Sequence, residues 1–206
     1  MNFHIKNIVI LPVIILLIAS CTTKKVTWAP EDEILIASYQ NNEPNSITLL
    51  TMINNTTGIG GHSALLINSK ERVLFDPAGT FKHPQIPERH DVFFGMNDTA
   101  VEKYIDYHAR PTIHVVMQNI EIDLKTAVEL TSLVKNYGPV QDMMCSYAIS
   151  EILNELHDFK TIPKSFFPKK IMKSFSKLEG VTTIKVYDYF LDDKSNIFSE
   201  RQGPKK

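Results

Sequence analysis

Apolar residues recur along the chain in short runs separated by turn-forming residues, a pattern typical of β-strands. Five such runs predict strands, at residues 46–52, 62–67, 72–76, 112–122 and 181–190. Only the polar stretch NSKE separates the second run from the third, so we expect these two to form an antiparallel hairpin. Pro77 and Gly79 end the third run, because proline cannot donate to a strand ladder and glycine permits a sharp exit.

Four other segments are expected to be helical, at residues 99–109, 124–137, 142–156 and 168–177. Asp123 is the expected cap of the second helix, and Gly138-Pro139 its end. In the third helix, Cys145, Ala148 and Ile152 fall on one face, the spacing of a stripe that packs on a core. A cluster of strands with separate helices predicts an α+β fold rather than a parallel doubly wound sheet.

The N-terminal pattern differs from the rest of the chain. Residues 1–20 carry one lysine, then an apolar run, then two small residues directly before Cys21. This pattern is typical of a secretory signal peptide, and the run is too short for a spanning helix. We therefore expect a signal peptide at 1–20, a lipidated tether at 21–45, one domain at 46–190 and a polar tail at 191–206.

The residues Ile18-Ala19-Ser20-Cys21 resemble the bacterial lipobox, in which the cysteine is lipidated and becomes the new N-terminus. The resemblance implies a lipoprotein of the bacterial cell envelope, held at the membrane by acyl chains on Cys21. Thr22 follows the cysteine where an aspartate would signal retention, which implies the outer membrane, facing the periplasm. The alternative is a plain signal peptide with a chance cysteine.

Chain length, charge balance and cysteine content limit the classes of protein to which the chain can belong. The roughly 185 residues after the leader suffice for one domain with a real core. The 22 basic and 23 acidic residues are interspersed, so no nucleic-acid partner is expected. The chain has two cysteines, and once Cys21 is acylated Cys145 is left as a single thiol without a disulfide partner. In an exported compartment such a thiol is either buried or used.

Cys145 is placed where a nucleophile would be activated. With Asp142 or Gln141 as the expected cap, Cys145 lies in the first turn of its helix, where the free amides and the helix dipole favour a thiolate. Its own N–H would be available to an oxyanion. A buried structural cysteine on the same stripe would give the same sequence pattern, so both interpretations stay open.

His62 is the candidate base for this thiol. It begins a predicted strand in the segment GGHSALLIN, and the two glycines before it would leave bare backbone for a substrate to approach the ring. In the predicted hairpin His62 faces Asp76 or Pro77, so the Asp76 carboxylate could orient the imidazole as the third member of a triad. The alternative is that Asp76 only caps the turn.

Other polar residues are candidates for roles in the same site. His114 lies in a predicted strand and is the second candidate for the base. Ser63, Gln141 and Tyr147 could line the site. No metal or cofactor is expected, because the spacing of the remaining histidines gives no metal-binding pattern (His83, His90, His108 and His114). A run of lysines is interpreted as a solvated helix face, with contact to anionic lipid as the alternative (Lys164, Lys169, Lys170, Lys173 and Lys177).

The order of these residues resembles the circularly permuted branch of the NlpC-like papain-fold cysteine hydrolases. That branch includes YaeF/YiiX-type bacterial proteins and lecithin:retinol acyltransferase. The matching positions are His62 in GGHSALLI, Asp76 in VLFDPAG and Cys145 in DMMCSYAISEIL, and the resemblance covers roughly residues 46–160. It implies a papain-like antiparallel sheet packed against helices. The strings GGHSALLIN, VLFDPAGTF and CSYAISEIL also resemble those of proteobacterial lipoproteins.

These observations predict a membrane-anchored cysteine hydrolase that cleaves an amide or ester bond through an acyl-thioester. The expected location suggests peptidoglycan peptides as substrate, and the permuted relatives suggest lipid acyl groups. Met144-Cys145-Ser146-Tyr147 stands where the acyltransferase relatives have an Asn-Cys-Glu-Phe-like tetrad, so the acyl substrate class stays open. The alternatives are an acyltransferase that acts on lipid and a non-catalytic envelope lipoprotein with a structural thiol.

Overall fold

A seven-stranded antiparallel sheet forms the centre of the protein in a computed structural model, which describes residues 27–188. The strand order is β4-β5-β3-β2-β1-β6-β7. The strands are β1 (Ser46–Asn54), β2 (Gly60–Asn68), β3 (Arg72–Phe75), β4 (Glu88–Arg89), β5 (Val92–Phe93), β6 (Ile113–Glu121) and β7 (Thr182–Val186). The helices are α2 (Glu31–Ala37), α3 (Asp98–His108), α4 (Leu124–Tyr137), α5 (Cys145–Leu153) and α6 (Pro168–Phe175), with a 3₁₀ turn at His157–Phe159. The expected mixture of helices with an antiparallel sheet is confirmed.

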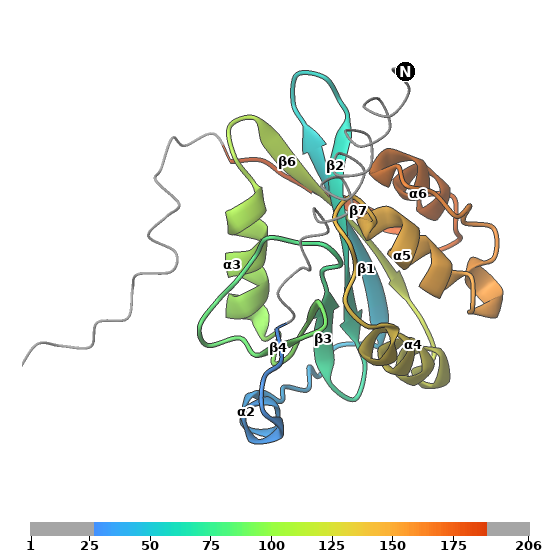
Figure 1. Cartoon of the computed structure of the whole chain (residues 1–206). Helices are drawn as coiled ribbons and strands as arrows, with labels where there is room; N and C mark the ends of the chain where they lie inside the picture. The colour runs from blue at the N-terminus through green and yellow to red at the C-terminus, as the bar shows by residue number, and fades with distance from the viewer. Residues whose placement is uncertain (1–26, 189–206) are drawn as a thin grey trace, which may run out of the picture.

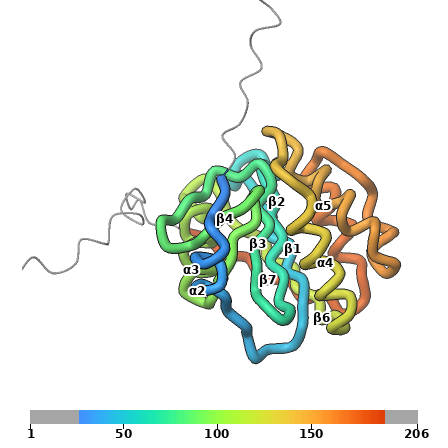
Figure 2. The backbone as a smooth tube through the Cα atoms, turned by 60° about the horizontal axis from the view of Figure 1, so that its bottom comes forward, coloured from blue at the N-terminus to red at the C-terminus, as the bar shows by residue number. Residues whose placement is uncertain are grey.

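Helices cover both faces of the sheet (Figure 1). One core cluster joins the sheet to α4, α5 and α6, through side chains such as Leu130, Ile149 and Phe175. A second cluster joins the other face to α3, mainly through Val101 and Tyr104. Figure 2 shows α3 and α5 on opposite sides of the sheet. Because both faces are covered, every residue of β1 from 47 to 53 is buried, which explains why this strand does not alternate between apolar and polar.

The hairpin of β2 and β3 forms as predicted, but its register differs. Leu65 pairs with Phe75 and Asn68 with Arg72, because the turn holds three residues between the paired ends. Continued along β2, this register would place His62 opposite Ala78. The prediction that His62 lies directly opposite Asp76 or Pro77 is therefore wrong, although His62 and Asp76 still share one face of the sheet as diagonal neighbours.

Two segments contain elements that their sequence patterns did not predict. The loop-rich stretch 80–98 includes β4 and β5, each only two residues long. The segment 21–45, expected to be a tether, includes α2, whose Ile34 is buried in the core together with Ala29. Elements this short give too few residues for a periodic signal. The expected leader, Cys21 and the tail lie outside the described residues.

Helix boundaries follow local capping. The side chain of Asp123 accepts a hydrogen bond from the Thr126 amide (2.9 Å) and begins α4, as predicted. In α5 the expected cap at Asp142 or Gln141 is wrong, since Met144 occupies the cap position without a side-chain hydrogen bond. Cys145 is consequently the first residue of the helix, where the amide has no partner within the helix.

Candidate active site

The structure brings the His62 ring against the Asp76 carboxylate. His62 Nε2 lies 2.6 Å from Asp76 Oδ1, and the side chain of Asp76 is only 1% exposed. His62 lies in β2 and Asp76 directly follows β3, on the same face of the sheet. An ion pair at this distance, shielded from water, fixes which ring nitrogen faces the carboxylate.

A bulge in β2 positions His62. Met52 of β1 pairs with His62, but the next residue, Ile53, pairs with Gly60, so Gly61 is the extra residue in the ladder. Bulges of this kind redirect a neighbouring side chain. The predicted role of both glycines as bare backbone needs correction for Gly60, because a Cβ there would lie 2.9 Å from Pro168 and the Lys169 amide. Gly61 has open space around it and lines the cavity described below.

Backbone and side-chain contacts hold Asp76 in place. Its amide donates to the Asp91 carbonyl (2.8 Å), and its own carbonyl accepts from the Gly79 amide (3.0 Å) in a tight turn. The Tyr104 hydroxyl donates to Asp76 Oδ1 (2.7 Å) from α3. Tyr104 is fully buried and was not predicted as a site residue. Its only sequence signal is a tyrosine on the buried stripe of an amphipathic helix, which usually indicates core packing.

Cys145 approaches from the opposite face of the sheet, at the first turn of α5. The His62 ring and the Ser63 backbone amide interact with the thiol and favour its ionised form. Its sulfur also lies 3.9 Å from the Ser146 hydroxyl. Because His62 Nε2 faces Asp76, the ring nitrogen left for the thiol is Nδ1. The structure thus brings the three predicted residues together, and Cys145 itself is 5% exposed.

Asp91 links the segments that carry the acid and the thiol. Its carbonyl accepts from the Asp76 amide, while its carboxylate accepts from the Val140 amide (2.8 Å) in the loop before α5. Asp91 is itself buried and has a φ of 65°, a conformation that few residues other than glycine adopt. No sequence pattern distinguishes this aspartate from an ordinary loop residue.

The three groups shift one another's protonation. Burial lowers the pKa of His62, but the charge and hydrogen bond of Asp76, aided by Cys145, outweigh it and raise the pKa to about 10. Burial raises the pKa of Asp76, yet the adjacent imidazolium holds it below its ordinary value. Burial likewise opposes ionisation of Cys145, and the contacts with His62 and Ser63 lower the thiol pKa nonetheless. The arrangement favours an imidazolium between two anions.

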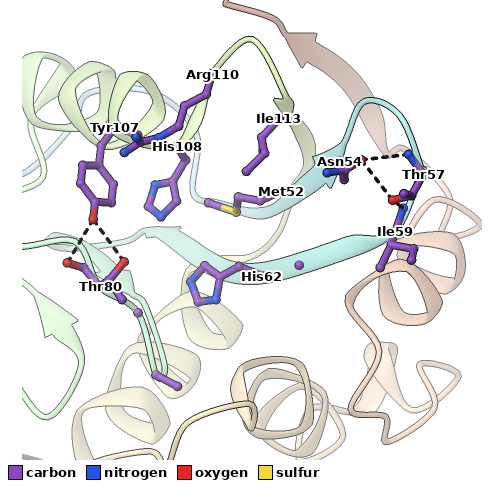
Figure 3. A pocket seen from close by; sticks show the side chains of 13 residues that line it. Met52, Asn54, Thr57, Ile59, His62, Thr80, Tyr107, His108, Arg110 and Ile113 are labelled. Carbon is purple, nitrogen blue, oxygen red and sulfur yellow. Dashed lines mark hydrogen bonds between the residues drawn. The ribbon is translucent and has the colours of Figure 1, made fainter. Parts of the chain in front are cut away.

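A cavity of about 580 Å³ opens beside His62 (Figure 3). His108 stands across from His62 in its wall, with the two ring centroids 5.8 Å apart and nearly parallel. The Nδ1 atom of His108 lies 2.9 Å from the Tyr104 carbonyl, so Nδ1 carries the proton and donates it. Burial lowers the pKa of His108 to about 4, so this ring is neutral and its Nε2 is a hydrogen-bond acceptor.

The other sequence candidates lie elsewhere or take other roles. His114 contacts Asn55 (2.6 Å) and stacks on Tyr187, away from Cys145. Ser63 contributes its amide to the site, and its hydroxyl lies 3.3 Å from that of Ser146. Tyr147 stacks on Phe166. Between residues 27 and 188 no cluster of three or more potential metal ligands occurs. No helix in that range is both long and apolar enough to cross a bilayer.

Comparison with known proteins gave no match among protein-family models, curated proteins or solved structures.

The packing of Asp76 against Gly79 generates a stability prediction. A Cβ on residue 79 would lie 1.8 Å from Asp76 Oδ2, whereas one on residue 61 would meet nothing within 4 Å. Gly79→Ala must therefore displace the carboxylate, and we expect it to lower the free energy of unfolding by about 1–3 kcal/mol. Gly61→Ala is the matched control and should leave stability unchanged. Urea unfolding measures both, and equal values for the two variants would contradict the packing described.

The His62–Asp76 pair predicts a pH dependence of stability. Because the pKa of His62 is raised in the folded state, protonation of His62 stabilises the fold. This contribution is complete below the unfolded-state pKa of 6.5 and is lost as pH rises through about 10. Because the pKa of Asp76 is lowered in the folded state, ionisation of Asp76 also stabilises the fold. This contribution is complete above the unfolded-state pKa of 3.8 and is lost on further acidification. Both contributions are complete between these unfolded values.

We therefore expect the stability difference between wild type and the double variant His62→Gln, Asp76→Asn to shrink from pH 5 to pH 9.5. The change should be on the order of 2 kcal/mol. Urea unfolding at the two pH values, at constant ionic strength, measures it. A difference that stays constant across this range would show that the pair does not hold the raised His62 pKa.

Proposed function

We propose that the protein is a cysteine hydrolase that cleaves an amide or ester bond through an acyl-thioester on Cys145. The observation that carries the proposal is the His62 ring held between the Asp76 carboxylate and the Cys145 thiol. Each member has the environment that its role requires: a fixed acid, an oriented imidazole and a thiol of lowered pKa at a helix N-terminus.

In the proposed reaction the Cys145 thiolate attacks the carbonyl carbon, and His62 holds the proton that the thiol has given up. The Cys145 amide, without a partner within α5, donates to the developing oxyanion. Collapse of the tetrahedral species breaks the bond to the leaving amine or alcohol, which takes the proton from His62. Water, deprotonated by His62, then hydrolyses the thioester and restores the thiol.

The order of the site residues supports assignment to the permuted papain-like class. His62 and Asp76 lie on neighbouring strands that precede the cysteine helix in the chain, as the sequence resemblance implies. The antiparallel sheet with α5 packed across it is the arrangement that such a fold requires. We extend the proposal to location: Cys21 would anchor the domain in the bacterial envelope, facing the periplasm, where peptidoglycan peptides and lipid acyl groups are both within reach.

Thiol reactivity tests the proposal. Iodoacetamide alkylates the thiolate, so labelling of Cys145 in the folded protein reports on the pKa of the thiol. At pH 7 we expect His62→Ala to be labelled at least about ten-fold more slowly than wild type, because the imidazolium no longer stabilises the thiolate. His114→Ala removes a histidine from another strand and should label like wild type. Peptide mass spectrometry over time gives the rates.

Two results would contradict the proposal. Equally slow labelling of wild type and His62→Ala would favour the alternative from the sequence, a lipoprotein with a structural thiol. Hydrolysis of 4-nitrophenyl butyrate that persists in Cys145→Ala would place the chemistry at another residue.

Tyr104 is proposed as a positioning residue that acts through Asp76. Its hydroxyl helps to hold the pKa of Asp76 low, so Tyr104→Phe should let Asp76 take up a proton at higher pH. The acid limb of the alkylation profile then moves to higher pH, by on the order of one unit.

The matched control for Tyr104 is Tyr137→Phe, which removes a similar hydrogen bond, from Tyr137 to Glu151 (2.8 Å), outside the site. Its pH profile should coincide with that of wild type. A purely structural role for Tyr104 predicts a lower melting temperature with an unmoved acid limb, and that outcome would remove Tyr104 from the proposed mechanism.

A further inference from the structure

The cavity beside His62 is unbalanced in charge. Its described lining includes no carboxylate, and Arg110 is its one permanently charged side chain. The rest of the lining includes the apolar side chains of Met52, Ile59 and Ile113. Arg110 is an exposed residue at the rim of this cavity. A cation beside a lining without a described carboxylate attracts an anionic group.

Arg110 is held in place at this cavity. Its backbone amide and carbonyl both pair with Ile113 (2.8 and 2.9 Å) in a tight turn after α3. Its Nε donates to the Tyr107 carbonyl (3.1 Å), and the guanidinium lies over the Tyr107 ring, 5.3 Å from its centroid. Between residues 27 and 188 no carboxylate forms an ion pair with it. Among the described residues, no carboxylate competes with a ligand for its two terminal amino groups.

His108 lies between Arg110 and His62. It precedes Arg110 by two residues and stacks on His62, so the cavity wall runs from His62 through His108 to Arg110 (Figure 3). The free Nε2 of His108 accepts a hydrogen bond, which suits an N–H or O–H of a substrate. A substrate that extends along this wall from His62 would contact the Nε2 acceptor of His108 and then the guanidinium of Arg110.

We propose that Arg110 binds a carboxylate of the substrate, so that the site prefers amides or esters that carry a free carboxylate near the bond to be cleaved. The inference rests on the proposed cysteine hydrolase function and deepens it. The planar guanidinium matches a carboxylate with two parallel hydrogen bonds. One cation balances one negative charge, which favours a carboxylate over a doubly charged phosphate. A neutral acyl chain would leave Arg110 unused.

Matched esters test the preference. 4-Nitrophenyl hemiglutarate carries a carboxylate on its acyl chain, and 4-nitrophenyl butyrate is its neutral counterpart. A second pair places the charge on the leaving group instead, 3-carboxy-4-nitrophenyl butyrate against 4-nitrophenyl butyrate. Each kcat/KM is divided by the rate of hydroxide-catalysed hydrolysis of the same ester, which removes differences in intrinsic reactivity.

We expect wild type to prefer the charged member of at least one pair by about ten-fold or more, the value of a charge-assisted hydrogen bond. Arg110→Gln should abolish this preference, because kcat/KM for the charged ester falls relative to that for the neutral ester by about ten-fold. Lys103→Gln removes a charge from α3 outside the cavity and should keep the preference. A far-UV circular dichroism spectrum that matches wild type shows that each variant is folded.

Two outcomes overturn the inference in different ways. Hydrolysis that depends on Cys145 but shows no Arg110-dependent preference in either pair would remove the carboxylate site and leave the proposed hydrolase intact. Absence of Cys145-dependent hydrolysis for every ester would overturn the proposed function, and the substrate preference with it.

Discussion

The buried charge of Asp76 is the constraint on which the candidate site depends. A carboxylate with 1% exposure is tolerated only when it is paired and hydrogen bonded. His62 supplies the positive charge and Tyr104 a further donor. The same contact commits one ring nitrogen to the acid and turns the other toward Cys145. A single electrostatic requirement thus orients the imidazole and, through it, lowers the pKa of the thiol.

Backbone contacts between segments distant in the sequence position Asp76, His62 and Cys145 relative to one another. Asp91 accepts the Asp76 amide with its carbonyl and the Val140 amide with its carboxylate, so the end of β3 and the loop before α5 share one partner. The bulge at Gly61 turns the neighbouring His62 toward the same point. The positive φ angle of Asp91 is consistent with a backbone conformation held by these contacts rather than by local preference.

Local sequence patterns predicted most of the fold and the three central residues, but not the contacts that align them. Asp123 and the apolar runs act over a few residues, so their consequences can be inferred from spacing alone. The hairpin register depended on the length of the turn. Its three residues place Ala78 opposite His62 in place of Asp76 or Pro77, and Asp76 lies two residues away on the same face. Tyr104, His108 and Asp91 act across long sequence separations, and an α-helical tyrosine or a loop aspartate gives no sign of its partner. The short elements β4, β5 and α2 are stabilised by packing that the sequence pattern does not reveal.

The two halves of the candidate site belong to different hydrophobic cores. His62 and Asp76 lie on the face that packs against α3, whereas Cys145 begins a helix that packs on the opposite face. A chain in which only one core has formed can hold the acid and the imidazole together, but its cysteine remains an ordinary thiol. Chemical reactivity therefore appears only when both layers are assembled. The lowered pKa of the thiol is thus a property of the completed fold, and a partly folded chain carries a cysteine no different from any other.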